Sequence, residues 1–430
     1  MKIRRLRAFT PELEKFIAAN YADLQEYEAG VAEIGKIVKE KGNLGVFELT
    51  KKYDKAVLNE DNFLVSDEEV EEAYDLVDDD YIWAIRNAID NIADFHSRQL
   101  RNSWMEPDEN GNILGQLYRP LERIGIYVPG GTAAYPSSVL MNAIPAQVAG
   151  VTEIAMVSPP DANGKMNPYT LVAASELGLV EIYKMGGAQS IFALAYGTET
   201  IPPVDLISGP GNIYVTIAKK MVYGTVNIDM LAGPSEILII ADEFANPEFI
   251  AADMMSQAEH DVLARSLLVT DSKKLIDKVE KEIQRQIQDL SRKDIIEQSL
   301  NSYGAFILAD DIYEACEVSN IVAPEHLELM VQQPFDLLSR IRDAGAIFMG
   351  EYTPESVGDY YAGPNHILPT GGTAKFYSPV TVDTFMKASS LIYYSKNALK
   401  EDADDIIKIA SVEGLTAHAN SIKVRKENLD

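Results

Sequence analysis

The stretch EILIIADEFANPEFIAADMMSQAEHDVLARSLLVTD, residues 236–271, decides the fold. An apolar run, EILIIA, is followed by the helix-like segment NPEFIAADMMSQAEHD and then by a second apolar run, SLLVTD. The two runs are 28 residues apart, counted from Ile239 to Leu267, which is a spacing that a right-handed strand–helix–strand unit can span. The stretch therefore predicts two parallel strands joined by a helix.

The same pattern occurs earlier in the chain. RIGIYV, residues 123–128, precedes a helical pattern over 137–149 and the run EIAMVS, residues 153–158, with 28 residues between Ile126 and Ile154. More apolar runs follow at GAFILA, residues 304–309, and GAIFMG, residues 345–350. We predict an α/β protein with two lobes of mainly parallel sheet. The repeated pattern suggests a duplication, although generic strand–helix–strand geometry alone also produces such a repeat.

The flanking segments have helical patterns. Residues 1–118 are predicted to be mostly helix, because Ser66 followed by Glu69 has the pattern of a capping box and an acidic amphipathic run continues to His96. We interpret His96 as a surface residue. Beyond about residue 383 the pattern predicts a helical tail.

Composition limits the classes of function. With 430 residues, of which 47% are hydrophobic and 24% charged, the chain can form large cores and two to four domains. Its net charge of -28 argues against nucleic acid and against an anionic membrane surface as partners. No apolar stretch reaches the length of a membrane span, of about 18 residues, and none follows the basic start MKIRRLRAFT as in a secretory signal. A single cysteine, Cys316, allows no internal disulfide and fits the cytoplasm.

Several polar residues are candidates for a metal site. Gln257 and His260 share a helix face about one turn from its end, where an amide oxygen and an imidazole can chelate a metal, although a solvated polar face is the commoner explanation. Asp359, in a long loop over 350–372, either completes this site or is a turn residue. His418 would add a second imidazole, while Glu413 would lie on another face of a continuous helix. Two histidines, an aspartate and a glutamine suit zinc or a similar divalent ion.

Glu325 and His326 form an adjacent acid–imidazole pair in a chain with five histidines. Adjacent side chains diverge by about 100° on a helix and about 180° on a strand, so we do not expect them to contact each other. They are either separate surface groups or converge on a third group. Cys316 falls among packing positions and is interpreted as inert. His366 is expected to form a hydrogen bond within the turn GPNH.

The glycine-rich segments YVPGGTAAYPSS, KMGGAQS and SGPGNIY contain neither the dinucleotide fingerprint nor the phosphate-loop motif. They offer backbone that a ligand can approach closely, with Tyr127, Gln189 and Asn212 as aromatic or polar contacts. Taken singly, such segments are more often ordinary turns between a strand and a helix.

Eight segments, in this order, resemble the histidinol dehydrogenase family: ERIGIYVPGGTAAYPSSVLMNAIPAQVAGV, GGAQSIFALAYGTE, GPGNIYV, AGPSEILIIAD, SQAEHD, APEHLEL, AGPNHILPTGGTA and EGLTAHANS. They cover about residues 122–421. The resemblance implies a site in which zinc, one ion per subunit, is bound by Gln257, His260, Asp359 and His418. It also implies catalysis by Glu325 and His326, NAD binding by Tyr127, Gln189 and Asn212, and substrate binding by Ser235, Glu413, His326 and the four metal ligands.

The architecture that the resemblance implies is an intertwined homodimer of two similar, incomplete Rossmann-like lobes, with Glu413 and His418 reaching the site of the other subunit. Its expected boundaries are 1–23 for an N-terminal helical arm, 24–126 plus 237–378 for a first lobe with the metal and catalytic residues, 127–236 for an inserted second lobe on the NAD side, and 379–430 for a C-terminal helical dimerisation tail.

The activity that the resemblance implies is the zinc-dependent, four-electron oxidation of L-histidinol through L-histidinal to L-histidine with two NAD, at the end of histidine biosynthesis. His326 is the natural base for the hydroxyl proton, because an unperturbed imidazole titrates near pH 6.5. Glu325 is expected to deprotonate the water that adds to the aldehyde. The alternatives are a related zinc- and NAD-dependent dehydrogenase of another small polar alcohol, a zinc hydrolase and a non-catalytic metal-binding protein.

Overall fold

The structure, a computed structural model, describes residues 2–18, 25–130 and 134–429. The chain divides into two compact units, of which the first contains Met1–Gln99 and Leu121–Phe385 and the second contains Leu100–Pro120 and Met386–Asp430. Positions 19–23 of the expected N-terminal arm lie outside the described residues. None of the helices in the described ranges is long and apolar enough to cross a membrane.

The larger sheet of the first unit is parallel throughout, with the strand order β1-β11-β10-β9-β12-β13. Its strands are β1 (Arg4–Arg7), β9 (Glu236–Ala241), β10 (Arg265–Thr270), β11 (Ala305–Leu308), β12 (His326–Met330) and β13 (Ala346–Met349). The associated helices are α1 (Pro11–Ala18), α10 (Pro247–Ala258), α11 (Lys273–Gln286), α12 (Lys293–Tyr303), α13 (Ile312–Val322) and α14 (Glu355–Tyr360).

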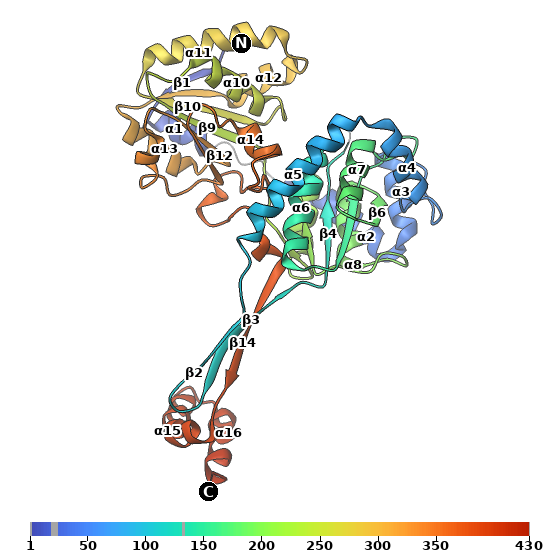
Figure 1. Cartoon of the computed structure of the whole chain (residues 1–430), viewed down its shortest axis with the longest axis vertical. Helices are drawn as coiled ribbons and strands as arrows, with labels where there is room; N and C mark the ends of the chain where they lie inside the picture. The colour runs from blue at the N-terminus through green and yellow to red at the C-terminus, as the bar shows by residue number, and fades with distance from the viewer. Residues whose placement is uncertain (1, 19–24, 131–133, 430) are drawn as a thin grey trace. The chain divides into compact units, whose positions relative to one another are not determined.

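Both faces of this sheet are buried, which explains why β9 is a continuous apolar run. Ile237 and Ile239 face a core shared with α10, α11 and α12, which gather on one side of the strands in Figure 1. Leu238 and Ile240 face the opposite core, to which α1 and α13 contribute. The predicted unit over residues 236–271 is confirmed, because β9 and β10 pair in parallel and α10 joins them.

The smaller sheet of the first unit is also parallel, with the order β6-β5-β4-β7-β8. Its strands are β4 (Arg123–Tyr127), β5 (Glu153–Ser158), β6 (Glu181–Lys184), β7 (Leu206–Ser208) and β8 (Asn227–Ile228). Its helices are α2 (Gln25–Lys41), α3 (Asn43–Tyr53), α4 (Asp67–Leu76), α5 (Asp79–Ser97), α6 (Pro136–Ala149), α7 (Pro168–Glu176), α8 (Gly187–Tyr196) and α9 (Ile213–Val222).

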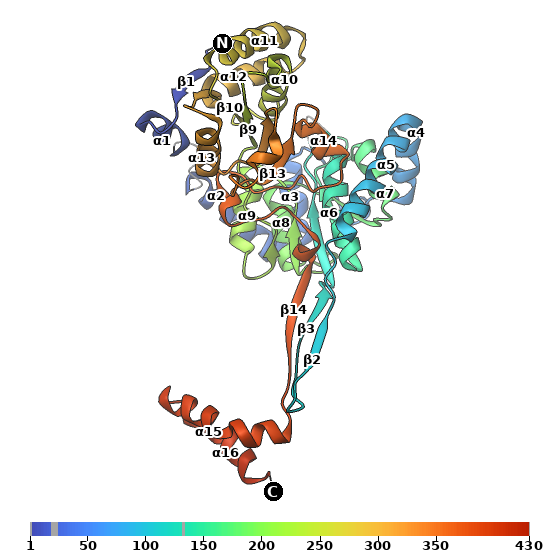
Figure 2. The same cartoon turned by 60° about the vertical axis from the view of Figure 1, so that its left-hand side comes forward.

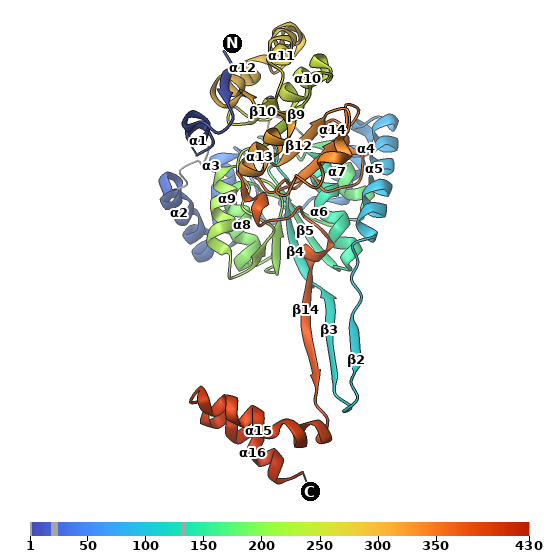
Figure 3. The same ribbon diagram turned by 90° about the vertical axis from the view of Figure 1, so that its left-hand side faces the viewer.

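Two groups of helices pack around the smaller sheet. Helices α2, α3, α8 and α9 share one core with its strands, whereas α4 to α7 pack against one another as a second group, and Figure 3 shows the two groups on opposite sides of β4 and β5. The predicted unit over residues 123–158 is confirmed by the parallel pair β4 and β5. If the strands are numbered along the chain from β9 in the larger sheet and from β4 in the smaller one, both sheets have the spatial order 3-2-1-4-5. The larger sheet has β1 as an additional edge strand.

The second unit is an antiparallel ribbon with two helices (Figure 2). Strands β2 (Trp104–Pro107), β3 (Ile113–Pro120) and β14 (Met386–Tyr393) pair in the order β14-β3-β2. Helices α15 (Lys396–Val412) and α16 (Thr416–Glu427) pack against each other. Short 3-10 turns elsewhere in the chain are η1 (Ile287–Asp289), η2 (Pro334–Leu337), η3 (Thr373–Lys375) and η4 (Val382–Phe385).

Some sequence predictions for the flanking segments are wrong. The segment from residue 383 is not helical throughout, because β14 pairs with β3. Residues 1–118 are mostly helical, as predicted, although β1, β2 and most of β3 also lie there. β1 and β14 depend on partners far away in the sequence, which local pattern does not reveal, whereas β2 and β3 pair with each other across a short loop. The capping box of Ser66 and Glu69 is confirmed. His96 is not a surface residue, since it is fully buried with Nδ1 2.9 Å from the side-chain oxygen of Gln99.

Candidate active site

The pair Glu325 and His326 lies at the amino edge of the larger sheet. Helix α13 ends at Val322, Ala323 turns the chain with a φ of 49°, and β12 begins at His326. The two side chains do not diverge as expected: Glu325 Oε2 lies 3.8 Å from His326 Nδ1. The expectation fails because Glu325 belongs to the turn that precedes the strand rather than to a regular element.

The main chain of Glu236, the first residue of β9, holds both members of this pair. Its N–H donates to Oε2 of Glu325 at 2.9 Å, and its carbonyl oxygen lies 3.1 Å from Nδ1 of His326. A carbonyl can only accept, so Nδ1 carries the proton and donates. Nε2 of His326 has no hydrogen-bond partner and lies 3.5 Å from Oδ1 of Asp359. Nε2 is therefore the nitrogen available to a reacting molecule.

Burial and neighbouring charges set the ionisation of this pair. Desolvation raises the pKa of Glu325 to about 8, against the opposing effect of His326. Burial alone would lower the pKa of His326, but the carboxyl groups of Glu355, Glu325 and Asp359 outweigh it and raise this pKa well above its usual value. Two groups whose ionisation depends on each other at short range are typical of a proton-transfer site.

A set of potential metal ligands adjoins His326. Gln257, in the last turn of α10, is fully buried, and His260 follows the end of that helix. The ligand atoms of His260, Glu355 and Asp359 all lie within 4.8 Å of one another. The structure thus brings together three of the four residues expected to bind zinc: His260 and Asp359 lie in this group directly, and Gln257 joins it through its hydrogen bonds to Glu355. Asp359 lies in α14 rather than in a turn.

Glu355 is the functional candidate that the sequence did not reveal. It is 1% exposed at the first position of α14. In the amide orientation that hydrogen bonding requires, Nε2 of Gln257 donates to both of its carboxylate oxygens, at 2.9 and 3.0 Å, and the amide oxygen points away from it. In the sequence, Glu355 looks like an ordinary acid in the first turn of an exposed helix, so no local signal could have identified it.

The remaining expected substrate residues divide between the units. Ser235 precedes Glu236 at the same sheet edge, where its carbonyl accepts from the N–H of Arg265 at 3.0 Å. Glu413 and His418 belong to the second unit, where both are exposed. They do not share a continuous helix, because Gly414, with a φ of 75°, separates α15 from α16.

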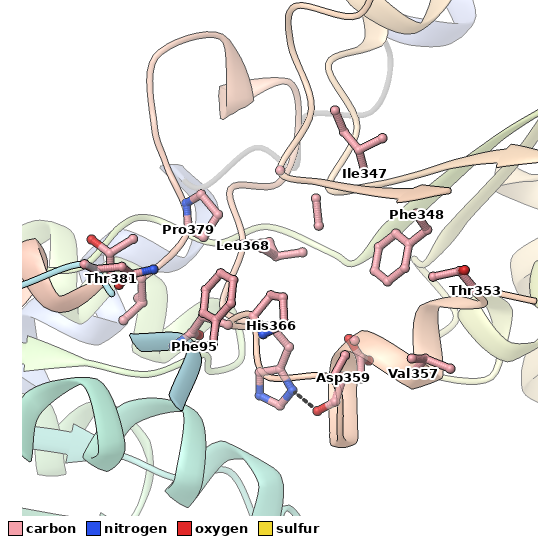
Figure 4. Close-up of a pocket in the computed structure, with 18 residues that line it drawn as sticks. Phe95, Ile347, Phe348, Thr353, Val357, Asp359, His366, Leu368, Pro379 and Thr381 are labelled. Carbon is pink, nitrogen blue, oxygen red and sulfur yellow. Dashed lines mark hydrogen bonds between the residues drawn. The ribbon is translucent and has the colours of Figure 1, made fainter. Parts of the chain in front are cut away.

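A cavity of about 340 Å³ opens beside Asp359 (Figure 4). Its walls are mainly apolar, from residues that include Phe95, Ile347, Phe348 and Leu368, and its polar groups include Asp359 and His366. Nδ1 of His366 lies 2.9 Å from the main-chain oxygen of Asp359, so the expected structural hydrogen bond exists but spans seven residues rather than the turn GPNH. A volume of this size suits a small organic molecule.

The residues expected to bind NAD lie at the carboxyl edge of the smaller sheet. Tyr127 ends β4, Asn212 caps α9 after β7, and Gln189 is in the first turn of α8. The hydroxyl of Tyr127 accepts from the N–H of Gly187 at 3.3 Å. The strand order reverses between β4 and β7, and in such sheets ligands bind outside the carboxyl ends at that point.

A buried ion pair fixes the loop after β7. Lys219 and Asp229, whose side chains are 3% and 0% exposed, contact each other. Lys219 Nζ donates to the carbonyl of Gly209 at 2.9 Å, and Asp229 Oδ2 accepts from the N–H of Gly209 at 2.8 Å. A Cβ at Gly209 would lie 2.1 Å from the carbonyl oxygen of Tyr127, so only glycine fits there. The pair clamps this loop directly against β4.

Cys316 plays no part in either site. It is 1% exposed in the core beneath α13, and burial raises the pKa of its thiol to about 11. A thiol in this environment is a poor nucleophile, and its predicted inert packing is confirmed.

Fold and site together define an α/β protein with a buried histidine–carboxylate centre on one parallel sheet and a group of polar residues at the switch point of another. The family model for histidinol dehydrogenase matches residues 18–426. Histidinol dehydrogenase of Heliobacterium mobile is 56% identical over 416 residues, 97% of each chain, and that of Clostridium acetobutylicum is 58% identical over 388 residues, 90% of each. The crystal structure of histidinol dehydrogenase from Elizabethkingia anophelis matches with a TM-score of 0.94 at 38% identity, covering 99% of this chain and 98% of that one.

The chain therefore belongs to the histidinol dehydrogenase family and is an NAD-dependent oxidoreductase.

Proposed function

We propose that this protein oxidises L-histidinol through L-histidinal to L-histidine, with reduction of two NAD per turnover. The observation that carries the proposal is the state of His326. Its Nδ1 is engaged by the carbonyl of Glu236, its Nε2 has no hydrogen-bond partner, and Glu325 lies 3.8 Å away. An imidazole with one free nitrogen beside a carboxyl group suits a reaction that moves protons twice.

We propose that zinc is bound by Gln257, His260 and Asp359 of one subunit and by His418 of the partner subunit. The residues fit the ion, because His260 and Asp359 have ligand atoms close enough to share one cation, and Glu355 fixes the Gln257 amide with its oxygen turned away. When bound, zinc would act as a Lewis acid that orients the substrate.

His326 would accept the hydroxyl proton at Nε2 in each oxidation. The carboxylates around it favour its charged form, whereas a cation bound to Asp359 would offset part of that negative charge and favour the neutral, proton-accepting imidazole. Glu325, held by the N–H of Glu236, would deprotonate the water that adds to the aldehyde. A carboxyl pKa of about 8 gives Glu325 more basicity than an ordinary glutamate.

The cofactor is proposed to bind through Tyr127, Gln189 and Asn212, where, when bound, it would accept the hydride. The clamp on Gly209 supports this position, since it holds the loop that leads to Asn212. Two sheets of the same strand order agree with an interpretation as two incomplete Rossmann-like lobes. The expected boundary at residue 126 needs correction, because α2 to α5 and β4 pack with the smaller sheet and so belong with 127–236 rather than with 237–378.

We further propose a homodimer to whose assembly the C-terminal segment, 379–430, contributes. Glu413 and His418 are exposed in the unit to which they belong, as residues that act on another subunit would be. Neither Glu325→Gln nor His418→Ala is expected to form L-histidine. Mixing the two proteins under exchange conditions should restore L-histidine formation, because one hybrid site would be intact. Demonstrated exchange without recovery would contradict the shared site.

The activity is tested by following the absorbance of reduced nicotinamide with L-histidinol and NAD. We expect two NADH per L-histidinol consumed and L-histidine as the product. Absence of NADH with L-histidinol, together with NADH from another small alcohol, would show a related dehydrogenase instead.

A further inference from the structure

Asp54 places a carboxylate beside the proposed cofactor residues. It caps the C-terminus of α3, its N–H donating to the carbonyl of Thr50 at 2.8 Å, and α3 packs against α8. Nε2 of Gln189 lies 3.5 Å from Oδ2 of Asp54, and the Asp54 carboxylate is near enough to Tyr127 to raise the pKa of its hydroxyl further. Asp54 thus faces two of the three residues assigned to NAD.

This position is unfavourable for a carboxylate in the free protein. The side chain is largely buried, and desolvation raises its pKa to about 6 without a cation to offset it. It also lies at the end of a helix where the backbone dipole is negative. The flanking lysines are engaged elsewhere: Lys55 Nζ donates to the carbonyl of Lys52 at 2.7 Å, and Lys52 Nζ donates to Tyr53 at 3.1 Å. Packing therefore does not account for Asp54, whereas ligand binding would.

The smaller sheet lacks the acidic residue that dinucleotide-binding folds commonly place after the second strand. Strand β5 ends in Ser158 and continues into Pro159 and Pro160. The next acid, Asp161, holds its own turn by accepting from the N–H groups of Asn163 and Lys165, at 2.8 and 2.9 Å. In such folds that acid accepts hydrogen bonds from a ribose hydroxyl of NAD. An acid from another element could supply the same contact here.

We propose that Asp54 selects NAD over NADP by accepting a hydrogen bond from the 2′-hydroxyl of the adenosine ribose. A carboxylate offers only acceptors, so it matches a hydroxyl donor and repels the 2′-phosphate of NADP. The proposal rests on the proposed function, because it assumes that NAD binds beside Tyr127 and Gln189.

The test compares kcat/KM for NAD and for NADP in the full-length wild type and in Asp54→Asn, with L-histidinol saturating. We expect the preference for NAD to fall by about tenfold or more, because the variant loses a charge-assisted hydrogen bond to NAD and the repulsion of NADP. Asp61→Asn, which changes an exposed carboxylate of the following loop, is the matched control and should leave the preference unchanged.

A preference that stays constant in Asp54→Asn overturns the inference, even if both cofactors bind more weakly. Tyr127→Phe and Gln189→Ala separate this outcome from failure of the cofactor site itself. If they raise the KM for NAD while Asp54→Asn leaves the preference intact, only the role of Asp54 is wrong. If they leave the KM for NAD unaltered, the proposed cofactor site is wrong as well.

Discussion

Asp229→Asn should destabilise the first unit strongly, because it leaves the ammonium group of Lys219 buried without a counter-charge. Asp229 also accepts from the N–H groups of Gly209 and Met230, at 2.8 and 2.6 Å. The amide can keep only part of these bonds and none of the charge. Removing one partner of a buried ion pair costs about 3–5 kcal/mol.

The assay is urea unfolding followed by far-UV circular dichroism, with the free energy of unfolding taken from midpoint and slope. Asp94→Asn is the matched control: its ion pair with Arg98 is about 70% exposed on both sides, so a loss of less than about 0.5 kcal/mol is expected. The double variant Lys219→Met with Asp229→Asn should recover part of the loss, since no charge is left buried. The clamp also predicts a higher KM for NAD in Asp229→Asn with the KM for L-histidinol unchanged. A variant within about 1 kcal/mol of wild type would refute the reasoning.

Two further predictions concern carboxyl groups that the sequence did not single out. Asp54→Asn should raise the free energy of unfolding at pH 7.5 by about 1 kcal/mol; a pKa of about 6 implies a larger gain, which partial exposure to solvent reduces. The raised pKa means that the folded protein favours the protonated carboxyl group, so wild-type stability falls as pH rises from about 4 to about 6. Thermal melting should therefore show no gain for the variant at pH 4. Glu355→Gln should lower zinc affinity about 10- to 100-fold in competition with a chelator while far-UV circular dichroism stays unchanged, because the Gln257 amide loses an acceptor. Glu351→Gln, in the preceding loop, is its control, and equal zinc retention in both variants would remove Glu355 from the site.

The parts of the fold that the sequence predicts are those with local periodicity. β4, β5, β9 and β10 are apolar runs at fixed spacing, and the helices between them have matching patterns. β14 could not be recognised in this way, since it is a strand only through its pairing with β3, more than 260 residues away. The alternating faces of β9 explain why the two cores follow directly from one sequence run.

For the active site, the sequence supplies the residue types and the fold supplies their convergence. Gln257 and His260 share a helix end, but Asp359 comes from a helix about 100 residues later, so their residue types only suggested a common metal site and the family resemblance made the assignment. Glu236 and Glu355 escaped notice because nothing in their neighbourhoods distinguishes them from ordinary strand and helix acids. The main-chain groups of Glu236 that hold Glu325 and His326 have no sequence signal at all.

The most direct measurement of the central claim is product analysis of Glu325→Gln, with Glu317→Gln on the exposed face of α13 as control. In a rapid-quench experiment with L-histidinol and NAD, we expect the Glu325 variant to form L-histidinal at close to the wild-type rate and almost no L-histidine, whereas His326→Asn slows both oxidations. L-Histidine formation by Glu325→Gln at the wild-type rate would contradict the division of proton transfers between Glu325 and His326.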